Sequence, residues 1–145
     1  MAKQILIGDD SAFMRAMLRS VFTKAGYETA GEAESGEEVV RKFAEFRPEL
    51  VTMDIVMRGD GGLRAAKEII SRDPSAKILM VSAMGQQALV IEAIQAGAKG
   101  FIVKPFEPEQ LIQEVKRILE DGHSEARSAE ESRSFGRPSR PQDDK

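Results

Sequence analysis

The stretch VTMDIVMRGDGG (residues 51–62) changes character half-way along. It opens with a short apolar run of the kind found in strands that are buried on both faces of a parallel sheet. The run ends on a carboxylate, Asp54, and two glycines then precede a segment with helical spacing at 63–73. The stretch therefore predicts a strand, a loop and a helix, with an acid at the end of the strand.

The same alternation continues on both sides of this stretch. Strands are predicted at 4–8, 28–33, 49–54, 76–83 and 100–103, and helices at 11–26, 36–46, 63–73, 86–98 and 108–122. Ser11 and Ser35 are the predicted N-caps of the first two helices. Strand–helix alternation favours a parallel sheet with helices on both faces. The predicted fold class is therefore α/β with a (βα)5 order of elements. The expected sheet is parallel and five-stranded, of the flavodoxin-like order 2-1-3-4-5.

The apolar content of each strand predicts its place in the sheet. Nearly all residues are apolar at 5–7, 50–53, 78–81 and 101–103, so these strands are expected to be buried on both faces. The 28–33 strand is more polar, which suits an edge of the sheet.

Composition limits the classes of function. The chain has 145 residues, a net charge of −3, a pI near 5.3 and no cysteine. A chain with no basic excess is a poor candidate for binding nucleic acid, and the absence of cysteine excludes disulfides and thiolate metal sites. No apolar run reaches the roughly 18 residues of a membrane span, and the start does not resemble a signal peptide. We therefore expect a cytoplasmic monomer with no membrane or nucleic-acid partner.

The composition changes after about residue 122. Residues 123–145 are rich in Ser, Arg, Glu and Pro, and such a segment cannot bury enough apolar surface to offset its ordering entropy. We expect one domain at 1–122 and a disordered tail at 123–145, which could carry a binding or modification site. His123, the only histidine of the sequence, falls in this tail, which argues against a histidine-based catalytic dyad or a multi-histidine metal site.

The residues that carry chemistry follow the predicted strands. Ligands of an open parallel sheet bind beyond the carboxyl ends of its strands. The polar residues at these ends are Asp9 and Asp10 after the first strand, Asp54 after the third, Ser82 after the fourth and Lys104 after the fifth. Any one of them alone could be a helix cap or a turn residue. Their occurrence at four different strand ends favours a shared site.

Three converging carboxylates repel one another unless a proton or a cation neutralises them. Oxygen ligands without Cys or His suit a hard cation, and Mg²⁺ fits a site that keeps its waters. Such a cation can share phosphoryl oxygens with Asp9, Asp10 and Asp54. Lys104 and Ser82 could hold other phosphoryl oxygens, and an aspartate could form an acyl phosphate as nucleophile.

These motifs resemble the response-regulator receiver family in its stand-alone, CheY-type chemotaxis form. The resemblance covers about residues 3–120 and rests on ILIGDDSAFMR, TMDIVM, VSAMGQQ and AIQAGAKGFIVKPF. It implies that Asp54 accepts a phosphoryl group from the phosphohistidine of a sensor kinase. Asp10, Asp54 and the backbone carbonyl of Val56 would bind Mg²⁺, and Asp9 would act through a coordinated water. Lys104 would pair with the phosphoryl group and precede a cis proline.

The resemblance also implies a switch. Ser82 would move toward the phosphoryl oxygen and Phe101 would turn inward, so that the surface of the fourth helix, fifth strand and fifth helix changes its affinity for a flagellar switch protein, a phosphatase or another partner. Val56 and Met84 would flank the site and tune hydrolysis of the acyl phosphate. The protein would not be an enzyme, beyond transferring phosphoryl to and from its own Asp54.

The loop after Asp54 departs from the family pattern D-I-x-M-P-x-M-D-G. Arg58 replaces the proline, Asp60 an apolar residue and Gly61 an Asp or Asn; Gly8 also replaces a β-branched residue. We expect the 57–62 loop to be looser than in the family, because proline restricts the backbone and Asp or Asn caps the following helix. Arg58 could attract a phosphodonor or pair with Asp60.

Parts of the sequence bear on other functions. Arg58, Gly59 and Asp60 spell an adhesion tripeptide, so an engineered or variant loop is one alternative. A phosphorelay shuttle is another, with the same fold and site. An aspartate-nucleophile phosphatase needs a second Asp two residues after the nucleophile, where this sequence has Val56. No DNA-binding segment follows residue 122, which argues against a transcription factor.

Overall fold

A computed structural model describes residues 2–58 and 61–120. Five parallel strands form one sheet in the order β2-β1-β3-β4-β5, as predicted. The strands are β1 (Gln4–Gly8), β2 (Glu28–Ala33), β3 (Leu50–Asp54), β4 (Ile78–Ser82) and β5 (Gly100–Val103). The (βα)5 prediction is therefore confirmed.

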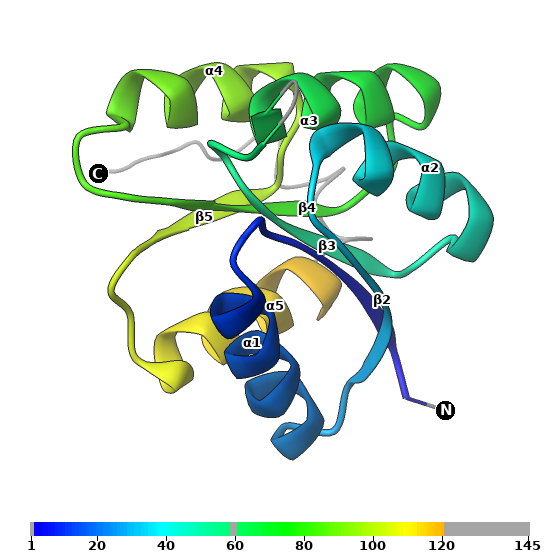
Figure 1. The fold of residues 1–145 in the computed structure, drawn as a ribbon, viewed down its shortest axis with the longest axis vertical. Helices are drawn as coiled ribbons and strands as arrows, with labels where there is room; N and C mark the ends of the chain where they lie inside the picture. The colour runs from blue at the N-terminus through cyan, green and yellow to red at the C-terminus, as the bar shows by residue number, and fades with distance from the viewer. Residues whose placement is uncertain (1, 59–60, 121–145) are drawn as a thin grey trace. The chain divides into compact units, whose positions relative to one another are not determined.

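The helices are α1 (Ala12–Lys24), α2 (Gly36–Phe46), α3 (Gly61–Arg72), α4 (Gln87–Ala96) and α5 (Pro108–Glu120). The compact unit that contains the sheet extends to Val115. Within it, α2, α3 and α4 cover one face of the sheet, and α1 and the 108–115 part of α5 cover the other (Figure 1). The predicted domain boundary at residue 122 and the predicted tail at 123–145 lie outside the described residues.

The alternation of side chains along each strand fills both faces of the sheet. The core cluster on the side of α2, α3 and α4 includes Leu6, Val51, Met53, Ile78 and Met80 from the strands. Their sequence neighbours Ile5, Ile7, Leu50 and Leu79 are also fully buried, and successive side chains of a strand point to opposite faces. The central strands are thus buried on both faces, as their apolar sequences predicted.

The prediction that the 101–103 strand is buried on both faces is wrong. In β5, Gly100 and Ile102 are buried, whereas Phe101 and Val103 are exposed. The cause is the strand order, which places β5 at an edge where one face is only partly covered. The polar β2 forms the other edge, as predicted.

Side-chain caps set the start of the first two helices. The Ser11 hydroxyl accepts a hydrogen bond from the Met14 N–H at 3.1 Å, and the Ser35 hydroxyl accepts one from the Glu38 N–H at 3.2 Å. Both predicted N-caps are therefore confirmed. The third helix begins at Gly61, two residues before the predicted 63–73 segment, because Gly61 and Gly62 begin the helix although glycine has a low helix propensity.

Candidate functional site

The register of the sheet aligns the carboxyl ends of β1, β3, β4 and β5 along one edge, which is the carboxyl-terminal edge of the sheet. Gly8 of β1 pairs with Met53 of β3, and Ser82 of β4 pairs with Val103 of β5. Backbone hydrogen bonds then continue past the strand ends: Asp9 N–H donates to Ala33 O, Ile55 N–H to Val81 O and Lys104 N–H to Ser82 O. The functional positions are therefore fixed by the sheet and not by free loops.

Three carboxylates meet at this edge. Asp9, Asp10 and Asp54 each offer an oxygen, and these atoms all lie within 4.8 Å of one another. Asp9 is buried, Asp54 is partly buried and Asp10 is exposed. The predicted convergence of the strand-end acids is confirmed, and the exposed Asp10 leaves the cluster open to solvent on one side.

The atoms of Asp9 show that the cluster fits a cation. Its Oδ1 accepts a hydrogen bond from the Ser11 N–H at 2.9 Å. Its Oδ2 is buried and has no hydrogen-bond partner within the described chain, since the Lys104 Nζ lies 3.6 Å away. A buried carboxylate oxygen without a partner is costly. An oxygen-only cluster with such an atom suits a hard divalent cation that retains water ligands.

Asp54 belongs to this cluster and also faces Lys104. Its Oδ1 accepts a hydrogen bond from the Val56 N–H at 3.2 Å, and its Oδ2 lies 3.4 Å from the Lys104 Nζ. Burial raises the pKa of the Asp54 carboxyl above its usual range; the Lys104 ammonium opposes this rise and the Asp9 carboxylate adds to it. The pKa of Asp54 is raised overall, so the surrounding protein groups do not fully stabilise the negative charge of its carboxylate.

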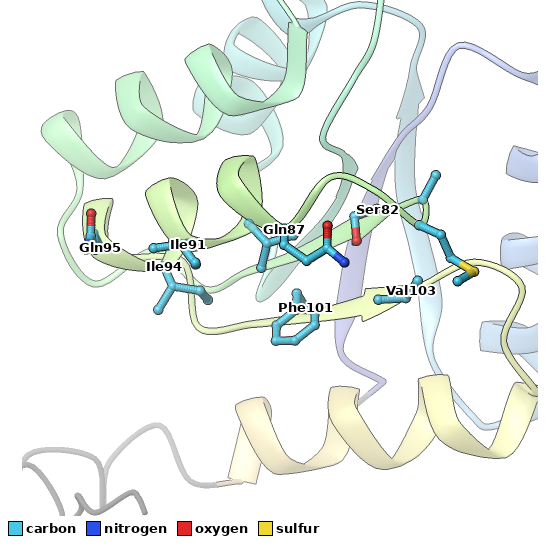
Figure 2. A pocket seen from close by; sticks show the side chains of 10 residues that line it. Ser82, Gln87, Ile91, Ile94, Gln95, Phe101 and Val103 are labelled. Atoms are coloured by element: carbon cyan, nitrogen blue, oxygen red, sulfur yellow. The ribbon is translucent and has the colours of Figure 1, made fainter.

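Ser82 and Phe101 lie beside the same groove. Ser82 is buried at the end of β4, whereas Phe101 on β5 is 46% exposed. Both line a groove of about 500 Å³ between α4 and β5, with Ile91, Ile94 and Val103 among the apolar residues of its wall (Figure 2). The groove gives the ring of Phe101 space on the side of α4. The predicted switch roles of Ser82 and Phe101 remain predictions.

The backbone next to the site confirms one further detail. The Lys104–Pro105 peptide bond is cis, as the resemblance implied. Val56 and Met84, the predicted flanking residues, are 53% and 80% exposed. Their side chains are accessible to a partner or to solvent.

A glycine allows the start of α3 to lie against the end of β3, where Asp54 is located. A Cβ on Gly62 would lie 1.8 Å from the Asp54 carbonyl oxygen, so no other residue fits here without moving the backbone. The N–H groups of Gly62 and Leu63 both donate to Ile55 O, at 3.1 and 3.2 Å. Gly61 has φ +84°, a conformation that favours glycine. The loop after Asp54 is thus hydrogen-bonded where it joins α3.

Gly59 and Asp60 lie outside the described residues. The predictions that fall on them are the Asp60 cap, the Arg58–Asp60 pair, the adhesion tripeptide at 58–60 and the looser 57–62 loop. Arg58 itself forms an ion pair with Glu34, with 3.4 Å between Nη2 and Oε1, and its backbone forms a parallel bridge with Ser35. The sequence did not predict this partner, which comes from the β2–α2 connection.

The sequence did not predict that Arg15 is a neighbour of the site. Arg15 on α1 donates from Nη1 to the Asp9 carbonyl oxygen at 2.7 Å. Its place one turn after the acidic pair, on the helix that Ser11 caps, was a signal that could have identified it. Gly8, which stands where the family pattern has a β-branched residue, has little space for a side chain, because a Cβ there would lie 2.7 Å from Val39 Cγ2. Val39 therefore fills the space that a β-branched side chain at position 8 would need.

The family follows from a comparison with protein-family models. Residues 5–116 match the response regulator receiver domain. The chain belongs to the response regulator receiver family. This receiver is 57% identical over 118 residues to the chemotaxis protein CheY of Thermotoga maritima, a match that covers 81% of this chain and 98% of the relative.

Other relatives agree with this assignment. The chain is 51% identical over 119 residues to the chemotaxis protein CheY of Bacillus subtilis, covering 82% of this receiver and 99% of the relative. Among solved structures it is similar to a chain of the CheX–CheY–BeF3–Mg complex from Borrelia burgdorferi. That likeness has a TM-score of 0.77 and 35% identity, and covers 80% of this chain and 88% of the other.

Within residues 2–58 and 61–120, no helix has the length and apolarity needed to cross a membrane.

Proposed function

We propose that this receiver is a phosphorylation-switched protein of a two-component chemotaxis pathway and that Asp54 is its phosphoacceptor. The observation that carries the proposal is the position of Asp54, between the Lys104 ammonium and the acidic oxygens of Asp9 and Asp10. A carboxylate held between a cation and a cation site is suited to accept a phosphoryl group.

Each side chain has a role in the proposed transfer. An Asp54 oxygen attacks the phosphorus, the phosphorus–nitrogen bond of the donor phosphohistidine breaks, and the electron pair of that bond stays on the imidazole nitrogen. Lys104 pairs with one phosphoryl oxygen as a point charge. Mg²⁺, held by Asp10, Asp54 and the Val56 carbonyl, with Asp9 acting through a water, would neutralise charge that develops on the phosphoryl oxygens.

The proposed output is a shift between two states of the α4–β5 groove. A phosphoryl group on Asp54 adds a dianion close to Ser82, whose hydroxyl can donate to it. Movement of Ser82 opens space at the inner end of the groove, and Phe101 can turn into that space and change the exposed surface. Hydrolysis of the acyl phosphate at the same site resets the switch, so the protein acts catalytically only on itself.

The partners follow from this role. The phosphodonor is a sensor histidine kinase, and the output partner is a flagellar switch protein or a phosphatase of the pathway. The CheX–CheY complex from Borrelia burgdorferi contains a related chain bound to a partner protein, which supports a protein partner for this receiver. The apolar groove at Phe101 supports a partner surface that buries apolar side chains.

Phosphotransfer from an autophosphorylated chemotaxis kinase tests this function. Label moves to the wild-type receiver in the presence of Mg²⁺ and does not move to Asp54→Asn. The phosphorylated receiver then binds a flagellar switch peptide more tightly than the unphosphorylated one. If the label instead passes on to a histidine phosphotransfer domain and peptide binding does not change, the protein is a phosphorelay shuttle.

A further inference from the structure

Arg15 on α1 contacts the backbone of the acidic cluster and not its carboxylates. Its Nη1 donates to the Asp9 carbonyl oxygen at 2.7 Å, and its Nε donates to Glu32 Oε1 at 3.2 Å. The side chain is 13% exposed, so this guanidinium is largely withdrawn from water. A charge-assisted hydrogen bond in such a place is stronger than one between neutral groups at the surface.

The bonded carbonyl belongs to the peptide unit that joins Asp9 to Asp10. The other side of Asp9 is already fixed, because its N–H donates to Ala33 O and its Oδ1 accepts from the Ser11 N–H. The Arg15 bond therefore fixes the remaining orientation of the turn that carries both acids. Asp10 is exposed, and within residues 2–58 and 61–120 no hydrogen bond holds its side chain, so its place depends on this backbone.

We propose that Arg15 is a positioning residue for the acidic cluster, and that Glu34 links it to Arg58 in the loop after Asp54. This inference rests on the proposed Mg²⁺-dependent function. Outer residues that orient metal ligands commonly change metal affinity by about 10–100-fold when they are replaced. Arg15 orients the ligands through their backbone, so its removal lowers cation affinity without removing any ligand.

The link to the acceptor loop consists of two ion pairs that share Glu34. Arg15 Nη2 lies 3.8 Å from Glu34 Oε2, and Arg58 Nη2 lies 3.4 Å from Glu34 Oε1. Glu34 and Arg58 are 53% and 62% exposed, so each pair is screened by solvent and salt. Arg58 therefore contributes less to the cation affinity than Arg15 does, and its contribution falls as the ionic strength rises. Through Glu34, the two ion pairs connect the turn that carries Asp9 and Asp10 with the loop that follows Asp54.

The geometry also explains why arginine is required. The guanidinium reaches a carbonyl and two carboxylates with three different nitrogens, whereas the ammonium of lysine is a single point. Lysine at position 15 can keep the charge and one of these contacts. It restores part of the lost affinity and not all of it.

Isothermal titration with Mg²⁺ tests the inference on the full chain. Arg15→Gln binds Mg²⁺ about 10–100-fold more weakly than wild type. The affinity of Arg15→Lys lies between the affinities of these two proteins. Arg58→Ala weakens binding by less than about fivefold at low salt, and this difference disappears at high salt. Arg19→Gln is the matched control, because Arg19 lies on the same helix and pairs with Glu32 without contacting the acidic turn. Its Mg²⁺ affinity stays at the wild-type value.

Amide chemical shifts separate positioning from unfolding. In Arg15→Gln the shifts change at Asp9, Asp10 and Ser11, while those of β3 and β4 keep their wild-type positions. An unchanged Mg²⁺ affinity in Arg15→Gln, or shifts that change throughout the sheet, overturns the inference. If either result is found while wild type binds Mg²⁺ and is phosphorylated, the positioning role of Arg15 is wrong and the proposed function still stands. If wild type binds no Mg²⁺, the proposed function and the inference both fail.

Discussion

The Nζ of Lys104 lies 3.4 Å from Oδ2 of Asp54, although 50 positions of the chain separate the two residues. The same ammonium lies 3.6 Å from Oδ2 of Asp9. One cation thus faces two carboxylates at the edge of the sheet. Since burial outweighs this ammonium in its effect on the pKa of Asp54, the site still lacks positive charge. A divalent cation would supply the positive charge that these carboxylates lack.

Replacing Lys104 by Met removes the ammonium and keeps a side chain of similar length. We expect phosphorylation of Asp54 by acetyl phosphate to slow by about 10²–10³-fold, the range seen when one transition-state charge partner is removed. Quenched-flow mass spectrometry measures this rate. Lys67→Met is the control, since Lys67 pairs with Glu92 on the surface. A Lys104→Met rate within twofold of wild type contradicts the assigned role.

Asp54→Asn tests the electrostatics of the apo site through stability. Burial raises the pKa of Asp54 in the folded state above the unfolded value of about 3.9. Between these two values the folded state binds more protons than the unfolded state, so stability falls as pH rises through this window. Above the window wild type carries this full penalty, and Asp54→Asn does not.

We therefore expect Asp54→Asn to melt at a higher temperature than wild type at pH 7 without divalent cations. Below the unfolded pKa of about 3.9 the two proteins should melt alike, because both carry a neutral side chain at position 54. Thermal unfolding followed by circular dichroism across this pH range provides the comparison. A variant that is less stable than wild type at pH 7 shows that Lys104 outweighs burial.

Asp10→Asn separates cation binding from folding. Asp10 is exposed, so its replacement has little effect on the apo fold. A ligand at 100 times its Kd stabilises a folded protein by about 2.7 kcal/mol, and we expect wild type to gain this stability from Mg²⁺. Asp10→Asn should lose most of the gain. Differential scanning calorimetry with and without Mg²⁺ measures it, and an equal gain in both proteins removes Asp10 from the site.

Gly8 and Val39 should show strong coupling. A Cβ on Gly8 would lie 2.7 Å from Val39 Cγ2, so Gly8→Ala overpacks the core at a cost of roughly 1–3 kcal/mol. In the Val39→Ala background this contact is absent, and the same substitution should cost much less. Urea unfolding of the four proteins of this double-mutant cycle gives the coupling energy. A cost of Gly8→Ala that is equal in both backgrounds contradicts the packing account.

The sequence predicted the parts of the site that depend on strand ends. Asp9, Asp54, Ser82 and Lys104 each follow an apolar run, and parallel strands bring such positions to one edge. The fold class followed from the same alternation. These features depend on local periodicity, which is visible without coordinates.

Other features depend on contacts that periodicity does not encode. The exposed face of β5 could not be told from a buried one, because Phe101 and Val103 are as apolar as core residues. The ion pairs of Glu34 depend on how the β2–α2 connection approaches α1, which carries Arg15, and the loop that carries Arg58. The fit of Gly8 against Val39 depends on the packing of α2 on β1. In each case the deciding neighbour is distant in sequence.

The most direct test of the account is the chemical state of Asp54 after incubation with acetyl phosphate and Mg²⁺. Intact-mass and peptide mass spectrometry should find one added phosphoryl group, placed on Asp54 and removed by hydroxylamine. Asp54→Ala should gain none, and wild type without Mg²⁺ should gain little. If wild type gains no phosphoryl group, or gains it equally when Asp54 is replaced, Asp54 is not the phosphoacceptor and the proposed function is wrong.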